Sequence, residues 1–480
     1  MRGLADLALA QARSLGADYA DIRLCRYLDQ DIRARDKIIT GLGSSETRGF
    51  GIRTLYKGAW GFASSSEVTE EEIESAARLS VQIARSSAIC QKDEVRMVDV
   101  PIYEDKWQTP YEKDPFQIPI NDKKDLLLKI NEEMLKVPGI KRTTSFMSFT
   151  REEKYFASTV GSHIEQLVLR THSGYTAVAV GERDFQRRSF EAPPLNIGYE
   201  HIEKAPLVQN ARRVAEEAVE KLSAAECPTG VRDLVLSPSN LSLTIHESIG
   251  HATELDRVLG QEADYAGTSF ATIERVGKLQ YGSRVVNILA DRTMPAGRAT
   301  VGYDDDGVKS GKWYIIKEGL LVGYSTNREL AAKIGEAQSR GCNYADSWRS
   351  IPIIRMPNVY LEPGGKDAPT PEELIADTKN GVYIEGRGSW SIDQERRNFQ
   401  FGGDAFWEIK NGQRTRMLKN VTYRSNTVDF WNSCDAVCGK EFWEPQGVTN
   451  CGKGQPPQRA QQTHGASPAR FRKVNVGEAR

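Results

Sequence analysis

The sequence predicts an α+β protein, with an N-terminal α+β domain over residues 1–226. A β-rich, sandwich- or barrel-like C-terminal domain is expected over residues 227–480. Two observations support this organisation. The chain has 480 residues, too many for a single hydrophobic core. Helices and strand-like runs are mixed in the first half, whereas strands separated by Gly, Asn and Asp turns dominate the second half. The pattern breaks at Cys227-Pro228-Thr229-Gly230, where we place the boundary.

The N-terminal half opens with apolar residues at helical spacing between Leu4 and Leu15, which predict a helix. GFGIRTLYKGAWGFASS, residues 49–65, is typical of two strands joined at Lys57-Gly58. Thr69 followed by Glu72 forms a capping box that begins the next helix. The remaining elements are an irregular connection over 98–119, a helix over 122–136, a meander of strands over 142–200 and a helix over 204–224.

The C-terminal half opens with the strand RDLVLSP and a helix that begins with Ser237 as N-cap and Pro238 at its first position. Many strand-like runs follow, among them NILAD, WYIIKEGLLVGYS, NVYLEPG, GVYIEGRG and NFQFGGDAFWEIKNGQ. An exposed edge of such a sheet would suit an extended peptide that binds by strand addition. The basic stretch from Arg459 to Arg480 is interpreted as a solvated tail or a last strand.

Composition excludes several classes of partner. Lys and Arg number 64 and Asp and Glu 65, so the net charge of -1 provides no field for nucleic acid or an anionic membrane. No apolar run approaches the length that spans a bilayer. The seven cysteines are odd in number and scattered, which argues against a disulfide framework and favours a cytoplasmic location.

The stretch HESIGH, residues 246–251, indicates a metal site of unusual spacing. Zinc peptidase helices usually carry H-E-x-x-H, with the two histidines four residues apart. Here His246 and His251 are five apart, which on a regular helix separates them by about 140°, too far to share one ion. A π-helical bulge would bring both to one face, and we expect Gly250 to accept that distortion.

The acidic residues of this region have expected roles around the metal. Glu247 follows the first histidine, as does the general base of zinc peptidases. Glu254, seven residues later, returns to nearly the same side of the helix and would orient a histidine or act as a third ligand. Asp256 is a weaker candidate of the same kind. The alternative is two partly exposed histidines beside a capping glutamate, but an otherwise apolar helix favours the metal site.

A catalytic zinc needs three protein ligands and an open position, so one ligand must come from elsewhere. Cys451 in VTNCGKGQ is flanked by turn residues, and we expect an accessible thiolate whose pKa Lys453 lowers. Cys434 and Cys438, four apart, are other sources of a ligand. His464 would serve either as a ligand or as a donor to the oxyanion. The residues alone leave these alternatives open.

The sequence resembles the TldD/PmbA family, metallopeptidases also described as modulators of DNA gyrase. The resemblance runs over nearly the whole chain and rests on blocks such as GFGIRTLYKGAWGFASS, HESIGHATELD, IPIIRMPNVYLEPG and NCGKGQ. Because the H-E-x-x-x-H motif is complete, the chain is similar to the catalytic, TldD-like subunit rather than to its PmbA-like partner. The resemblance implies a zinc ion held by two histidines and a cysteine, which here are His246, His251 and Cys451. It also implies that Glu247 is the general base and that Glu254 supports the site.

The predicted function is therefore that of a cytoplasmic zinc-dependent peptidase acting on extended or unfolded polypeptides. Glu247 would deprotonate the zinc-bound water, and zinc together with His464 would stabilise the oxyanion. The alternatives are a non-catalytic peptide-binding subunit with a structural metal, closed by Cys434 or Cys438 as fourth ligand, and a zinc hydrolase of non-peptide substrates. The resemblance further implies unfolded or small peptide substrates and a homodimer, or a heterodimer with a PmbA-like subunit. Neither nucleic acid nor a membrane is expected as a partner.

Overall fold

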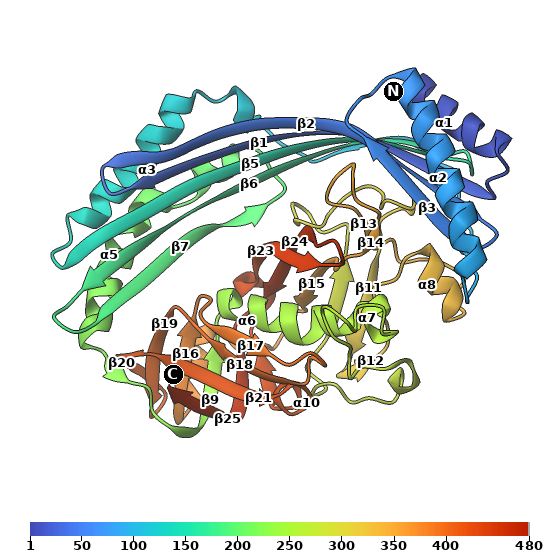
Figure 1. Ribbon diagram of the computed structural model, residues 1–480. Helices are drawn as coiled ribbons and strands as arrows, with labels where there is room; N and C mark the ends of the chain where they lie inside the picture. Colours follow the sequence, from blue (N-terminus) through green and yellow to red (C-terminus); the bar gives the residue numbers. More distant parts are fainter. Residues whose placement is uncertain (479–480) are drawn as a thin grey trace.

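The computed structural model describes residues 1–478 and is a mixed α+β structure. Its N-terminal part contains one seven-stranded sheet in the order β3-β2-β1-β5-β6-β4, with β7 also paired to β6. In Figure 1 the long strands of this sheet arch over the C-terminal part. The strands are β1 (Tyr19–Arg35), β2 (Ile38–Tyr56), β3 (Ala59–Ser65), β4 (Glu104–Gln108), β5 (Ile140–Ser158), β6 (His163–Val180) and β7 (Phe185–Leu195).

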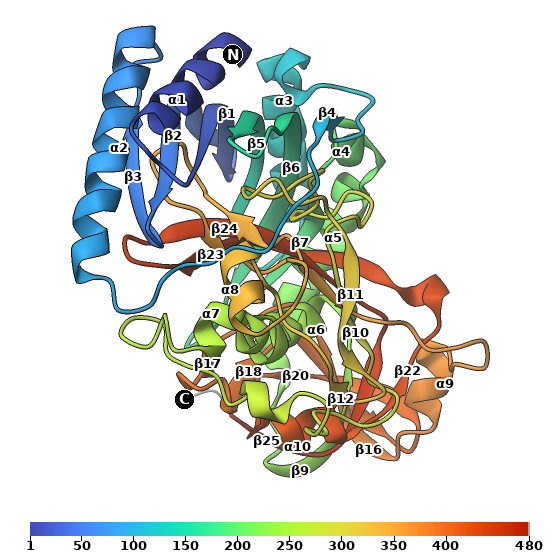
Figure 2. The ribbon, with the colours of Figure 1, turned by 90° about the vertical axis from the view of Figure 1, so that its right-hand side faces the viewer.

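Helices cover the two ends of this sheet with separate apolar cores. At one end, α1 (Arg2–Ser14) and α2 (Glu70–Cys90) pack on β1 and β2, with Leu24 and Ile73 fully or nearly buried. At the other end, α3 (Ile120–Leu135) and α5 (Leu207–Ser223), preceded by α4 (Glu200–Lys204), pack on β5, β6 and β7. Figure 1 shows the two groups of helices at opposite ends of the arched sheet, and Figure 2 views the same sheet from the end that carries α1 and α2.

Local signals for these elements are confirmed. The Thr69 side chain accepts a hydrogen bond from the Glu72 backbone N–H at the start of α2, which is one half of the expected capping box, and the Thr69 backbone N–H donates to the Glu67 carbonyl. Lys57 and Gly58 both have positive φ, 46° and 74°, the conformation that a tight two-residue hairpin turn requires. The meander over 142–200 is the antiparallel series β5, β6 and β7. Three features differ from expectation: β1 is a strand that the sequence did not predict, β2 begins eleven residues before residue 49, and the stretch expected to be irregular contains β4, which pairs in parallel with β6.

Up to residue 478, the C-terminal part is built from four sheets. The largest has ten strands in the order β17-β18-β21-β25-β9-β16-β19-β20-β8, with β22 paired to β25. No sheet within residues 1–478 closes into a barrel, so of the two expected architectures the barrel is not formed. The ten strands are β8 (Ala225–Glu226), β9 (Gly230–Leu236), β16 (Asn380–Glu385), β17 (Trp390–Ile392), β18 (Asn398–Gly402), β19 (Ala405–Lys410), β20 (Gln413–Lys419), β21 (Val421–Asn426), β22 (Cys434–Val437) and β25 (Ala469–Glu478).

Three smaller sheets and five short helices complete this part. The hairpin of β23 and β24 lies between the N-terminal sheet and α6, so it carries its residues into the interior (Figures 1 and 2). The strands are β10 (Ile288–Asp291), β11 (Lys312–Lys317), β12 (Leu320–Leu321), β13 (Asn343–Tyr344), β14 (Ile353–Ile354), β15 (Asn358–Leu361), β23 (Glu444–Lys453) and β24 (Gln458–Ala466). The helices are α6 (Pro238–Ile245), α7 (Leu255–Val258), α8 (Arg328–Lys333), α9 (Pro371–Ala376) and α10 (Thr427–Asn432).

The described part of the basic C-terminal stretch, residues 459–478, forms most of β24 and all of β25 rather than a solvated tail, and residues 479–480 lie outside the described residues. β25 pairs with both β21 and β9, and Phe471 is fully buried. Its arginines are neutralised by neighbours, because Arg470 and Arg472 both contact Asp435. The division between residues 226 and 227 stays a prediction; β8, on its N-terminal side, pairs with β20 of the C-terminal sheet.

Ion pairs fasten the two parts together. The turn before β11 carries three consecutive aspartates, all buried. Asp305 accepts from Lys154 of β5 at 2.8 Å, and Asp306 accepts from Arg53 of β2 at 2.6 Å. The Asp-rich turn is thus a buried charged contact between the N-terminal sheet and the C-terminal part.

Candidate metal centre

The metal-site helix begins and widens as the sequence predicts. The Ser237 side chain accepts from the Asn240 backbone N–H, and Pro238 stands at the first position of α6. The helix then continues as a π-helical turn over His246–Gly250, followed by a 3₁₀ turn over His251–Thr253. This widening brings the two histidine rings within 4.7 Å of each other, centroid to centroid.

Gly250 was expected to accept the backbone distortion of the π-helical turn, but the structure indicates a different reason for a glycine at this position. Its φ of -53° and ψ of -57° are ordinary helical values, so the π-helical turn does not need a glycine's conformational freedom there. A Cβ at this position would lie 2.2 Å from Sδ of the buried Met356. Gly250 therefore provides space for close packing under the widened turn.

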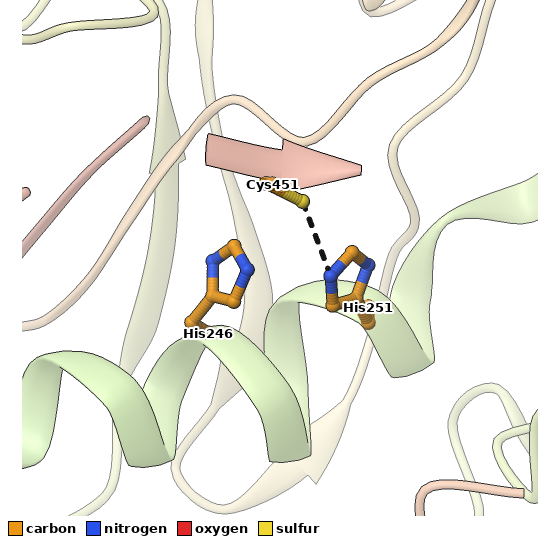
Figure 3. A group of neighbouring side chains, drawn as sticks. All are labelled: His246, His251 and Cys451. Atoms are coloured by element: carbon orange, nitrogen blue, oxygen red, sulfur yellow. Dashed lines mark hydrogen bonds between the residues drawn. The ribbon is translucent and has the colours of Figure 1, made fainter. Parts of the chain in front are cut away.

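Three candidate ligands converge at this turn. One ligand atom from each of His246, His251 and Cys451 lies within 4.8 Å of the others, and all three residues are buried. Figure 3 shows both imidazole rings pointing from the helix toward the thiol on β23. The thiol Sγ is 3.3 Å from Nε2 of His251. Two imidazole nitrogens and one sulfur are a donor set that suits zinc, whose usual four-coordinate geometry takes one further ligand.

Hydrogen bonds to Nδ1 of each ligand histidine determine which ring nitrogen carries the proton. Nδ1 of His251 lies 2.7 Å from Oε2 of Glu254, which can only accept, so Nδ1 carries the proton. Nδ1 of His464 lies 2.8 Å from the Val359 carbonyl, so Nε2 of His464 is an acceptor. That Nε2 is 2.7 Å from Nδ1 of His246, which must therefore donate. Both Nε2 atoms are consequently unprotonated and could bind a metal, and that of His251 accepts from the Cys451 thiol in this structure.

Burial keeps these imidazoles neutral, as metal ligands must be. It lowers the pKa of His251 to about 3, although Glu254 opposes the shift, and it lowers the pKa of His464 to about 4. Burial and the neighbouring His251 place the pKa of His246 well below its usual value. The site is therefore ready to bind a cation without first losing a proton from either ring.

The role expected for His464, as an oxyanion donor or ligand, stays a prediction. Both of its ring nitrogens are engaged, one by the Val359 carbonyl and one by His246. It is fully buried, and its Nε2 lies 2.7 Å from Nδ1 of His246.

The surroundings of the thiol also differ from expectation. Cys451 lies within β23 and is buried rather than accessible in a turn. Burial raises its pKa to about 11, and the opposing cation is Arg355, whose Nη2 is 3.0 Å from Sγ. Lys453 contacts two carboxylates instead, at 3.1 Å from Glu254 and 2.7 Å from Asp256. Deprotonation of the thiol would therefore accompany metal binding.

The other two cysteines proposed as ligands lie elsewhere. Cys434 is packed in the main C-terminal core, and Cys438 lies in a separate apolar cluster with Val235 and Leu374. Neither belongs to the group of candidate ligands found among the described residues.

Glu247 has a partner that sequence reasoning missed. Its Oε2 accepts from Nη1 of Arg396 at 2.6 Å, and both side chains are largely buried. Burial raises the pKa of Glu247 to about 7, while Arg396 opposes that shift. Arg396 lies 149 residues away in the turn between β17 and β18, and no motif in the sequence marks it.

Comparison with protein-family models identifies three matches along the chain. Residues 229–478 match the PmbA/TldA metallopeptidase C-terminal domain. Residues 113–226 match the central domain of the same family, and residues 20–84 match its domain 1.

Curated relatives and solved structures agree with these matches. A metalloprotease of Methanocaldococcus jannaschii is 29% identical over 436 residues, 91% of this chain and 92% of the relative. A zinc metalloprotease TldD homolog of Saccharolobus solfataricus is 25% identical over 475 residues, 98% of each chain. TldE from Thermococcus kodakarensis shares the fold, with a TM-score of 0.74 at 16% identity over 98% of each chain. Across residues 1–478, none of the helices has the length and apolar character needed to cross a membrane.

Proposed function

Because the chain belongs to the PmbA/TldA metallopeptidase family, we propose that it is a zinc-dependent peptidase that hydrolyses extended or unfolded polypeptides. The observation that carries the proposal is the convergence of two unprotonated imidazole nitrogens and a thiol, with Glu247 next to His246 in the chain. A zinc ion held by His246, His251 and Cys451 would supply the Lewis acidity that activates water and polarises the scissile carbonyl.

The protein's own residues then have distinct tasks. Glu247 accepts the proton of the attacking water and delivers it to the departing amine. Its burial supports this task, because a carboxylate with a pKa of about 7 is a stronger base than an exposed one. Glu254 and His464 hold the two ligand imidazoles in the required tautomer and orientation.

The position of the thiol supports a peptide as substrate. Cys451 lies on β23, whose other edge pairs with no strand among the described residues. A cavity of about 740 Å³ lies between β7 and the first residues of β23, reaching Gln446. Gln446 precedes Cys451 by five residues, roughly 17 Å of strand, so an extended chain beside β23 would run from the metal toward this cavity. We further propose that the protein forms a dimer, either a homodimer or a heterodimer with a PmbA-like subunit. We also propose the cytoplasmic location expected from the sequence.

The test pairs hydrolysis with metal content. A reduced, alkylated protein substrate is incubated with zinc-loaded wild type, with Glu247→Gln and with the exposed control Glu395→Gln, each alone and mixed with a PmbA-like protein. We expect Glu247→Gln to keep its zinc and to lose about 10²–10⁴-fold in rate, whereas Glu395→Gln stays active.

The same test separates the alternatives. A Glu247→Gln protein that kept zinc and hydrolysed as fast as wild type would defeat the assigned role. Wild type that bound zinc and peptide but cleaved nothing in either mixture would instead support the non-catalytic binding subunit.

A further inference from the structure

Arg396 is a buried cation that contacts the proposed general base. Only 13% of its side chain is exposed, and its Nη1 donates to Oε2 of Glu247 at 2.6 Å. Its Nε is buried and has no hydrogen-bond partner within residues 1–478. A buried guanidinium normally uses its donors, so this side chain has hydrogen-bonding capacity to spare beside the proposed base.

The backbone at this residue is held in a sparsely populated conformation. Arg396 has a φ of 63°, which non-glycine residues rarely adopt. Its backbone N–H donates to the Asp393 carbonyl at 3.0 Å, and its carbonyl accepts from the Thr427 hydroxyl at 2.7 Å. The adjacent Glu395 carbonyl accepts from the Phe270 backbone N–H at 3.1 Å. The surrounding structure thus maintains a strained turn that directs one side chain inward, a pattern that is common at functional sites.

During hydrolysis the negative charge next to Arg396 would move from Glu247 to the carbonyl oxygen of the substrate. As water attacks, an O–H bond breaks and its proton goes to Glu247, while a C–O bond forms and the carbonyl π pair moves to oxygen. Glu247 then becomes neutral, so Arg396 loses its counter-ion at the moment when a new negative charge appears. An interaction that becomes stronger in the transition state is one that accelerates the reaction.

We propose that Arg396 is a further catalytic residue, whose guanidinium passes from Glu247 to the developing oxyanion of the scissile carbonyl. This role rests on the proposed function. It would provide the oxyanion donor that the sequence predicted at His464, whose two ring nitrogens already have partners.

The experiment compares zinc-loaded wild type, Arg396→Gln, Arg396→Lys and the matched control Arg397→Gln, whose side chain is 41% exposed in the same turn. Two probes of one hexapeptide are titrated by calorimetry: a phosphonamidate, which is tetrahedral and anionic, and a fluoro-olefin isostere, which is planar and uncharged. Zinc content and kcat are measured on the same preparations.

We expect Arg396→Gln to bind the phosphonamidate about 10²-fold more weakly and to lose kcat to a similar extent, with unchanged zinc. Its affinity for the planar isostere should stay within about threefold of wild type, because that probe carries no oxyanion. Arg396→Lys should recover part of the phosphonamidate affinity, and Arg397→Gln should match wild type in both.

Equal losses for both probes would overturn the proposal, since they would assign Arg396 to general peptide binding. A loss that vanishes when the C-terminus of the phosphonamidate is amidated would also overturn it, in favour of a carboxylate anchor. Unchanged binding of both probes would mean that Arg396 has no such role. If wild type itself binds zinc but neither hydrolyses peptides nor prefers the phosphonamidate, the proposed function fails and this proposal fails with it.

Discussion

Replacing Gly250 by alanine tests how the widened turn is built. An alanine fits the local φ and ψ, and in a helix interior it is favoured over glycine by about 1 kcal/mol. Against this, its Cβ would lie 2.2 Å from Sδ and 2.6 Å from Cε of Met356, which is 1% exposed. Ordinary carbon contacts are about 3.5–4.0 Å, so Met356 must move by more than an ångström in a packed interior.

The net effect follows from these two opposing contributions. Overpacking of this kind costs about 1–3 kcal/mol, which leaves Gly250→Ala about 0–2 kcal/mol less stable than wild type. Because the strain falls within the turn that carries both histidines, we also expect weaker zinc binding. Urea denaturation of the apo protein and chelator competition for zinc measure the two effects separately.

Two further variants make the reasoning refutable. Gly3→Ala, in α1 with no atom within 4 Å of the added Cβ, should not destabilise the protein. Gly250→Ala combined with Met356→Ala should cost less than the sum of the single changes, because the clash has been removed. A Gly250→Ala protein with wild-type stability and zinc affinity would show that close packing does not explain the glycine. Strict additivity in the double variant would exclude Met356 as the cause.

Three further predictions concern the groups around the site and the contact between the two parts. His464→Phe should lower zinc affinity by about 10–100-fold in chelator competition, because His246 loses the acceptor that fixes its tautomer; unchanged affinity would exclude the positioning role. Lys453→Met should destabilise the apo protein by about 3–5 kcal/mol in urea, since two buried carboxylates lose their cation; a change below about 1 kcal/mol would contradict this. The pKa of Glu152 falls to about 2 because Lys154 and Arg170 outweigh its burial. Because the pKa of Glu152 is lower in the folded state, its ionised carboxylate stabilises the folded protein at pH values above the unfolded pKa of 4.5. This contribution, about 3 kcal/mol, is lost as the pH falls toward 2. Urea midpoints between pH 5 and 2.5 should therefore drop less in Glu152→Gln than in wild type, and parallel curves would refute the assignment.

Local signals account for the parts of the fold that could be predicted. The Thr69 cap, the Lys57-Gly58 turn and the start of α6 each depend on residues within one helical turn or one hairpin. The first half of β2 was missed because its side chains are mostly exposed, so no apolar alternation marks it. β4 lies in a segment rich in Pro and Asp, and its strand conformation depends on pairing with β6.

In the candidate site, too, local features could be predicted from the sequence and long-range contacts could not. The spacing of His246 and His251 is local, and it predicted the π-helical turn that the structure contains. Contacts between residues far apart in the sequence have no local signal that would predict them. His464 is 218 residues from His246, and Arg396 is 149 residues from Glu247. The burial of Cys451 could not be predicted for a related reason. The composition of the NCGKGQ block is typical of a turn, whereas in the structure Cys451 lies in a strand because β23 pairs with β24.

Zinc content of the purified protein tests the central claim most directly. Wild type is compared with His251→Ala and Cys451→Ser, and with Cys434→Ser as a control thiol in the core, after circular dichroism has established that all are folded. The account predicts about one zinc per chain in wild type and in Cys434→Ser, and loss of zinc in the other two. Zinc retained in Cys451→Ser, or no zinc in wild type even after reconstitution, would contradict the His246, His251 and Cys451 site.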